Sequence, residues 1–188
     1  IDRSRGLGDV YKRQIPNKEK VLTIIWLDGR NYGLKLSEKN KISEAMQLRA
    51  TTITSDGIIG EELAIDTRTC SCCQTSITVT DQGTVIAAYR DRSDDEIRDI
   101  SIARLEQNSW QEPFTLHDDG WELSGCPVNG PAISSIDKLV AVAWFTGAKG
   151  DSSVNVAFSD DDGKSFSKPY DIGNKNPIGR VDLEMLPD

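Results

Sequence analysis

Short runs of alternating apolar and polar residues, separated by turn residues, recur along the chain and predict β-strands. In the middle of the chain these runs come four at a time, and a tight turn at Asp81-Gln82-Gly83 separates the first two. Four short strands joined in order predict an antiparallel meander. The expected strands are 75–80, 84–89, 100–105 and 111–116, followed by 132–136, 139–145, 154–158 and 167–172.

The two meanders are copies of one repeating unit. The sequence SWQEPFTL at 109–116 aligns with SFSKPYDI at 165–172, an offset of 56 residues. The same offset places Cys70 on Cys126 without a gap. Further strands are expected at 21–27, 46–54 and 61–65 before these units, and at 180–186 after them. A repeat of this length indicates a fold built from stacked structural units.

The second strand of each unit is apolar on both faces, as VIAAY at 85–89 and LVAVAWF at 139–145 show. Such a strand must be covered on both sides, as neighbouring blades do in a β-propeller. A two-sheet sandwich is the alternative, although it favours strands that are apolar on one face. We therefore expect an all-β propeller fragment of about three four-stranded blades. Their approximate bounds are 20–66, 74–117 and 131–173, with another blade starting at 178–188.

Composition excludes several classes of partner. The formal net charge is −8 and the chain has no run of lysine and arginine, so nucleic acid is not an expected partner. No apolar run approaches the roughly 20 residues of a membrane-spanning helix. The single histidine, His117, excludes a His-rich metal centre and argues against a Ser-His-Asp hydrolase. We expect no cofactor and no metal.

Residues 1–14 are expected to lie outside the fold. The sequence DVYKRQ at 9–14 reads as the translation of GAT GTG TAT AAG AGA CAG, which resembles a transposase end sequence used in preparing sequencing libraries. We interpret 1–14 as an artefactual leader, with a disordered tail as the alternative, and 15–188 as the propeller part. A preceding signal peptide would then not be visible.

One turn carries a known motif. Residues 159–166, SDDDGKSF, fit the Asp-box of sialidases, in which the aspartate bonds backbone groups within its own turn. With the repeat, this turn resembles the sialidase (neuraminidase) superfamily of Asp-box (BNR repeat) β-propellers. The phrases at 26–30, 89–92 and 125–131 resemble a bacterial exo-sialidase-like branch. The motif residues are Ser159, Asp161, Gly163, Ser165 and Phe166.

This resemblance implies a secreted or periplasmic glycoside hydrolase with a six-bladed propeller, which releases a terminal acidic sugar from glycans. Arginines would bind the carboxylate of the sugar and an aspartate would be the general acid. The tyrosine nucleophile of sialidases would come from later blades of the same chain, together with further arginines. The alternative is a non-catalytic propeller that binds glycan or protein through the same loops.

Strand order places the candidate residues at one end of the fold. In each meander, the loop between the second and third strands and the connection to the next blade lie at the same end. Those loops hold the candidate acids Asp28, Asp66, Asp91 and Asp99. They also hold the candidate ligand-binding residues Arg30, Arg68, Arg90, Arg92, Arg98, Asn129 and Arg180. For each charged residue, a surface ion pair or a bracing role within the loop is the alternative interpretation.

The four cysteines lie on two of these connections. Cys70, Cys72 and Cys73 precede one blade and Cys126 precedes the next, so a disulfide between the two connections is expected. Cys72 and Cys73 are the better placed partners for Cys126, because a disulfide needs Cα atoms within about 7 Å. Free thiols and a thiolate metal site are the alternatives, and the spacing matches no established zinc pattern. A disulfide implies an oxidising compartment.

Overall fold

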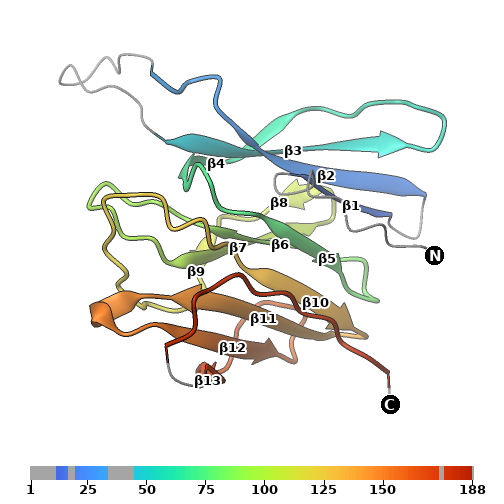
Figure 1. The fold of residues 1–188 in the computed structure, drawn as a ribbon. Helices are drawn as coiled ribbons and strands as arrows, with labels where there is room; N and C mark the ends of the chain where they lie inside the picture. Colours follow the sequence, from blue (N-terminus) through green and yellow to red (C-terminus); the bar gives the residue numbers. More distant parts are fainter. Residues whose placement is uncertain (1–11, 17–19, 34–44, 174–175, 188) are drawn as a thin grey trace.

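Three antiparallel β-sheets are stacked one on another in the computed structural model, which describes residues 12–16, 20–33, 45–173 and 176–187 (Figure 1). The first sheet has the order β1-β2-β3-β4 and the third has the order β10-β11-β12-β13. The second has the order β5-β6-β7-β8, with β9 also paired to β7. Each sheet is a meander in chain order, so the expected all-β fold of blade-like units is confirmed.

The strands begin and end close to the predicted positions. The first sheet contains β1 (Lys12–Pro16), β2 (Val21–Asp28), β3 (Met46–Thr54) and β4 (Leu63–Thr69). The second contains β5 (Ser76–Val79), β6 (Val85–Arg90), β7 (Ile100–Glu106), β8 (Ser109–Trp110) and β9 (Phe114–Thr115). The third contains β10 (Ala132–Ile136), β11 (Leu139–Thr146), β12 (Ser153–Ser159) and β13 (Tyr170–Asp171), with a 3₁₀ turn at Ala148–Gly150.

The first sheet differs from the prediction at its start. Its first strand is β1, which pairs with β2 from Lys12↔Trp26 to Pro16↔Leu22. Residues 12–14 therefore belong to the sheet, although the sequence placed them in the excluded leader. Residues 1–11 of that leader lie outside the described residues. With β1 included, the first sheet has the same four-strand order as the other two.

Two hydrophobic cores lie between the sheets, and β6 contributes to both. Val85, Ala87 and Tyr89 pack with residues of the first sheet, and Ile86 and Ala88 pack with residues of the third. All six residues of β6 are buried. The predicted coverage of this strand on both faces is therefore confirmed, because the neighbouring sheets supply it.

Hydrogen bonds join the second and third sheets along their first strands. The Gln74 side chain donates to the Gly130 carbonyl at 3.1 Å and accepts from the Gly130 N–H at 2.8 Å. The Ile133 N–H donates to Ser76 Oγ at 3.1 Å. A Cβ atom on Gly130 would lie 1.9 Å from the Gln74 carbonyl oxygen, so only glycine allows this approach.

The last described segment, 176–187, runs along the third sheet without a strand ladder of its own (Figure 1). The Arg180 N–H donates to Asn129 Oδ1 at 2.8 Å and the Met185 N–H donates to Ser134 Oγ at 3.1 Å. The second bond resembles that from Ile133 to Ser76. The segment thus lies on the third sheet in a way similar to that of β10 on the second, although the strand expected at 180–186 is not formed.

Within the described part of the chain, no helix has the length and apolar character needed to cross a bilayer.

Candidate functional site

The predicted functional loops lie at one end of the stacked sheets. The β6–β7 and β11–β12 connections are both at the left in Figure 1, and the β5–β6 and β10–β11 turns are at the right. This arrangement follows from the meander, because every second connection returns to the same end. The candidate residues divide into those bonded within the loops and those that line a pocket.

Arg90 has an internal role. Its side chain is 1 % exposed, and its guanidinium donates to the backbone carbonyls of Asn129, Arg98 and Phe145. The guanidinium carbon also lies 4.8 Å from the centre of the Trp121 ring, a cation–π contact. Each guanidinium nitrogen of Arg90 donates to a carbonyl and its surface is covered, so Arg90 fixes three connections to one another and is not available to a ligand.

Three further arginines surround Glu96. Arg92 donates to Glu96 at 2.8 Å and Arg98 donates to it at 2.5 Å, while Arg68 Nη2 lies 3.6 Å away. The hydrogen bonds from Arg92, followed by those from Arg98, lower the pKa of Glu96 despite some burial. The arginines of the β6–β7 connection are thus paired with Glu96 of the same connection.

Asp28 and Arg30 form a pair at the start of the β2–β3 connection. Arg30 donates to Asp28 Oδ1 at 2.8 Å and to Oδ2 at 2.7 Å, and it also contacts Glu62 at 2.6 Å. The hydrogen bond from Arg30 is the main reason why the pKa of Asp28 lies well below its usual range. An acid held so firmly in its charged form is poorly suited to donate a proton.

Asp99, Asn129 and Arg180 hold backbone segments together. The Asp99 carboxylate accepts hydrogen bonds from the Gly120 and Trp121 N–H groups at 2.9 and 3.0 Å. Burial raises the pKa of Asp99, and these backbone bonds oppose that effect. Asn129 accepts from the backbone of Arg180, whose own side chain is exposed.

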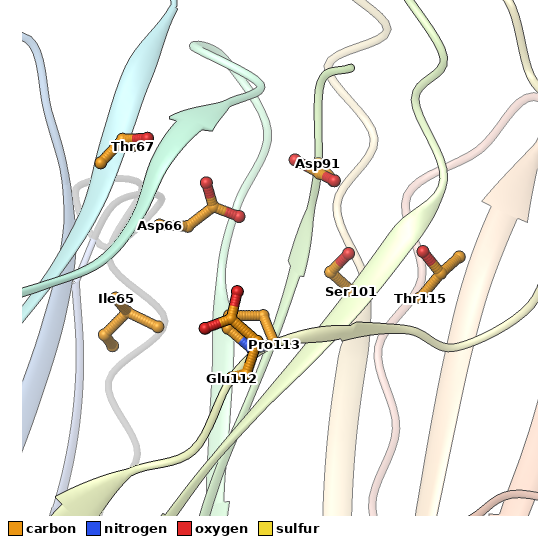
Figure 2. Close-up of a pocket in the computed structure, with 8 residues that line it drawn as sticks. All are labelled: Ile65, Asp66, Thr67, Asp91, Ser101, Glu112, Pro113 and Thr115. Atoms are coloured by element: carbon orange, nitrogen blue, oxygen red, sulfur yellow. The ribbon is translucent and has the colours of Figure 1, made fainter.

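The remaining two candidate acids line one pocket. It has a volume of about 380 Å³ and lies between the outer strand of the first sheet and the second sheet. Figure 2 shows Asp66 on β4 facing Asp91 at the end of β6, with Glu112 below them. The lining residues are Ile65, Asp66, Thr67, Asp91, Ser101, Glu112, Pro113 and Thr115.

The carboxylates of Asp66 and Asp91 have different surroundings. Asp66 accepts hydrogen bonds from the Tyr89 hydroxyl at 2.7 Å and from the Arg68 N–H at 2.9 Å. Asp91 accepts only the N–H of Arg92, at 2.7 Å, among the hydrogen bonds found for its side chain. Burial and then the negative charge of Asp66 raise the pKa of Asp91 to about 6. Asp91 is therefore the group that can hold a proton near neutral pH.

Tyr89 fixes the position of Asp66 from within the core. Its ring is fully buried, and burial followed by the nearby charge of Asp66 raises the pKa of its hydroxyl. The hydroxyl therefore stays protonated and donates to Asp66. It is not placed to attack a substrate.

Sequence reasoning did not identify Glu112, Ser101 or Tyr89 as site residues. Glu112 precedes β9 and was assigned to a plain strand, and Ser101 is a buried position of β7. They reach the pocket because β9 pairs with β7 at Ser101↔Thr115, a register that the apolar pattern does not specify. The repeat aligns Tyr89 with Phe145, and this alignment predicted only a packing role for Tyr89.

Hydrogen bonds to Asp161 and Ser159 hold the turn between β12 and β13. Asp161 Oδ1 accepts from the N–H groups of Lys164 and Ser165 at 3.0 Å, and Oδ2 accepts from the Ser165 hydroxyl at 2.6 Å. The Ser159 hydroxyl donates to Asp161 Oδ1 and accepts from the Gly163 N–H. Burial opposes the charge, yet these bonds lower the pKa of Asp161 to about 2.

The cysteines are paired Cys70–Cys73 and Cys72–Cys126. The second pair joins the two connections, with a Cα–Cα distance of 6.2 Å. The other pair closes a short loop, with Cα atoms 5.8 Å apart.

Neither a protein-family model nor a curated protein matches the sequence. Among solved structures, the chain is similar to a protein of unknown function from Dyadobacter fermentans DSM 18053. The TM-score is 0.54 at 13% identity, over 84% of this chain and 53% of that protein. The two share a fold, and the present chain spans about half the length of its neighbour.

Two glycoside hydrolases are more distant structural neighbours. The Hadza microbial sialidase Hz136 has a TM-score of 0.40 at 18% identity, over 69% of this chain and 34% of the sialidase. Fructan 1-exohydrolase IIa from Cichorium intybus, in complex with 1-kestose, has a TM-score of 0.45 at 11% identity, over 88% of this chain and 34% of the enzyme. The present chain spans about a third of the length of each of these two proteins.

Proposed function

We propose that the chain is part of a glycoside hydrolase and that the pocket between the first two sheets carries its acid. The observation that supports this most directly is the difference between Asp66 and Asp91. Glycosidases generally use two carboxyl groups, one of which has a raised pKa and donates a proton to the leaving group. Asp91, with a pKa of about 6, fits the acid, and Asp66, held by two donors, fits the carboxylate partner.

Arg68 is the reason to retain a terminal acidic sugar as the substrate. It directly follows the pocket residue Thr67, and its positive charge lowers the pKa of Asp91. Its side chain is 32% exposed and lies 3.4 Å from Asp94, which is 82% exposed. Exposed ion pairs are weak. Arg68 can therefore exchange its contacts with Asp94 and Glu96 for the carboxylate of a sugar.

The test is hydrolysis of paired sialosides and neutral glycosides by the full chain, each with a good and a poor leaving group. Asp91→Asn should lower kcat by about 10²–10⁴ for the poor leaving group and by much less for the good one, because only the former needs the acid. Arg68→Gln should raise KM for the sialoside alone. Asp95→Asn is the matched control, because Asp95 is an exposed neighbour with no place in the pocket.

Turnover of the poor leaving group that is equal in wild type and Asp91→Asn would contradict the proposal. If neutral glycosides are preferred and Arg68→Gln does not change that preference, an acidic sugar is not the substrate. The role of Asp91 as general acid would still stand.

A non-catalytic glycan-binding role is the second candidate, because catalysis of the sialidase type would need a tyrosine nucleophile from later blades. In this pocket Tyr89 bonds Asp66, but its ring has no exposed surface and cannot take that role. In that case sialosides would bind with no product formed, and Arg68→Gln would weaken binding. A secreted or periplasmic location is part of both proposals, and the pairing of all four cysteines supports it.

A further inference from the structure

The sulfur atoms of all four cysteines gather where two connections meet. The β4–β5 connection contributes Cys70, Cys72 and Cys73, and the β9–β10 connection contributes Cys126. Cys70 and Cys73 are buried, Cys72 is half-buried and Cys126 is exposed. The cluster therefore has a closed inner side and an open outer side.

The three sulfur atoms of the β4–β5 connection are spaced like ligands of one metal ion. Cys70 Sγ and Cys72 Sγ are 3.8 Å apart, and the three sulfurs of 70–73 all lie within 4.8 Å of one another. Cys126 joins them through its bond to Cys72. A tetrahedral zinc ion with Zn–S distances of about 2.3 Å has sulfur atoms about 3.8 Å apart. The unbonded Cys70–Cys72 contact already has that separation.

Hydrogen bonds anchor the β4–β5 connection on both sides of its cysteines, and those of Gln74 reach the β9–β10 connection. The Cys70 N–H donates to the Arg90 carbonyl at 3.0 Å. On the other side of the cysteines, Gln74 makes two hydrogen bonds with Gly130. These contacts flank the cluster, so reduction of the disulfides should leave the sulfurs close together. A ligand set that stays assembled without its covalent bonds is the requirement for a metal site.

The spacing also contains one recognised element. Cys70 and Cys73 are separated by two residues, the C-x₂-C spacing of a zinc-binding turn, and Cys72 lies between them. Thiolates favour zinc among the abundant divalent cations. The sequence as a whole matches no zinc pattern, because Cys72 lies inside the Cys70–Cys73 pair and Cys126 lies on another connection.

We propose that the reduced form of this cluster binds one Zn²⁺ through Cys70, Cys72, Cys73 and Cys126, and that the two disulfides are its metal-free, oxidised form. A dithiol or phosphine reductant supplies four electrons, and with four protons the two S–S bonds become four thiols. Zinc then forms four Zn–S bonds and displaces the four thiol protons. This inference is independent of the proposed glycosidase function.

The test is metal binding by the full chain after reduction with a phosphine and removal of the reductant without air. Titration with Co²⁺ should saturate at one ion per chain with the visible bands of tetrahedral thiolate cobalt, and Zn²⁺ should displace it. Zinc should also protect all four thiols from a thiol-modifying reagent. The untreated, oxidised chain should bind no cobalt at this site.

Cys126→Ser and Cys73→Ser should each abolish the tetrahedral spectrum, and Ser71→Ala, between the ligands, should leave it unchanged. Circular dichroism of the reduced chain before metal addition shows whether each variant still folds. A reduced, folded wild-type chain that binds no cobalt would overturn the proposal. So would equal binding by wild type and Cys126→Ser. Neither result depends on glycoside hydrolysis.

Discussion

Glu96 shows how individual charges are used at the loop end of this protein. It accepts hydrogen bonds from Arg92 and Arg98, while the neighbouring Arg90 bonds only backbone carbonyls. Most of the arginines that mark this end in the sequence therefore brace loops. The carboxyl groups of the pocket are different, because Asp91 is close to Asp66 and its side chain accepts a hydrogen bond from the backbone N–H of Arg92.

Asp91 should make the stability of the fold depend on pH. Its pKa is about 6 in the folded chain and about 3.9 in an unfolded one. Between these values the folded state holds a proton that the unfolded state has released, so stability should fall as the pH rises through this window. Asp91→Asn should remove this dependence.

Urea unfolding at about pH 4 and about pH 8 measures the effect through the shift of the midpoint. Relative to wild type, Asp91→Asn should be more stable at the higher pH than at the lower pH. Asp95→Asn should show no such change. If the unfolding midpoints of wild type and Asp91→Asn differ by the same amount at both pH values, Asp91 has an ordinary pKa in the folded chain.

Asp161 should have the opposite pH dependence. The hydrogen bonds of its turn lower the pKa of Asp161 to about 2. Its contribution to the stability of the folded chain is therefore present above about pH 4 and is lost as the pH falls toward 2. Asp161→Ala should cost about 1–3 kcal/mol at neutral pH, since several donors lose their acceptor. Asp160→Ala, at an exposed neighbour, is the control in the same denaturation experiment, and equal losses for both would refute the role of the carboxylate.

The chemistry of single residues could be predicted only in part from the sequence. Asp66 and Asp91 were predicted as acids because they follow apolar strands at the loop end, and the structure brings them together. Asp28 and Asp99 have the same sequence signature, yet one is paired with Arg30 and the other with two backbone N–H groups. Partner choice depends on the paths of the loops, which apolar periodicity does not encode.

At the scale of elements, the turns attach each sheet to the preceding one. The β12–β13 turn places Gly163 against β6 of the second sheet, at a φ of +75°. A Cβ atom there would lie 2.5 Å from Ile86 Cδ1. Thr84 also donates to Asp162 of the same turn. The turn is therefore part of the interface between two sheets as well as a link between two strands.

Gly163→Ala should therefore destabilise the chain more than Gly57→Ala does. Both glycines have positive φ, but a Cβ atom on Gly57 meets nothing within 4 Å. The extra cost at Gly163 should be about 1–3 kcal/mol, the usual range for overpacking. Thermal or urea unfolding of both variants gives the comparison.

Adding Ile86→Val to Gly163→Ala removes the clashing Cδ1 atom and should recover part of the loss. A double variant that is no better than the sum of its two single variants would show that the contact is not the cause.

Strand positions were largely predictable, because β-branched runs and turn residues are local signals. The strands β3 and β10 were predicted with their observed bounds. The pattern failed at 12–14, which belong to β1 although the segment reads as a leader, and at 180–186, which is extended but unpaired. Pairing is a property of the neighbouring strand, and a run of residues alone does not determine it.

At the scale of the whole molecule, the second sheet is the middle layer of two separate cores. Ile25 and Leu48 of the first sheet pack in one core, and Val142 and Trp144 of the third sheet pack in the other. The double-sided apolar strands made this stacking predictable. The sequence could not predict which connections would touch across the layers, and the pocket depends on those contacts.

The two cores should respond to mutation independently. Ile25→Val and Val142→Ala lie in different cores, so their effects on the free energy of unfolding should add within about 0.5 kcal/mol. Ile86→Val and Val142→Ala lie in the same core and should depart from additivity by more than this. Double-mutant cycles from urea unfolding measure both pairs, and equal coupling in the two pairs would argue against separate cores.

The Cys72–Cys126 pair has a mechanical consequence. All strands of the second sheet lie between these two residues, which are 54 positions apart. Tension applied to the two ends of the chain would pass through the sulfur bond and leave the middle sheet unloaded. Reduction would add roughly 180 Å of contour length to a stretched molecule, at about 3.3–3.6 Å per residue. Single-molecule extension should therefore report the redox state of the cluster directly.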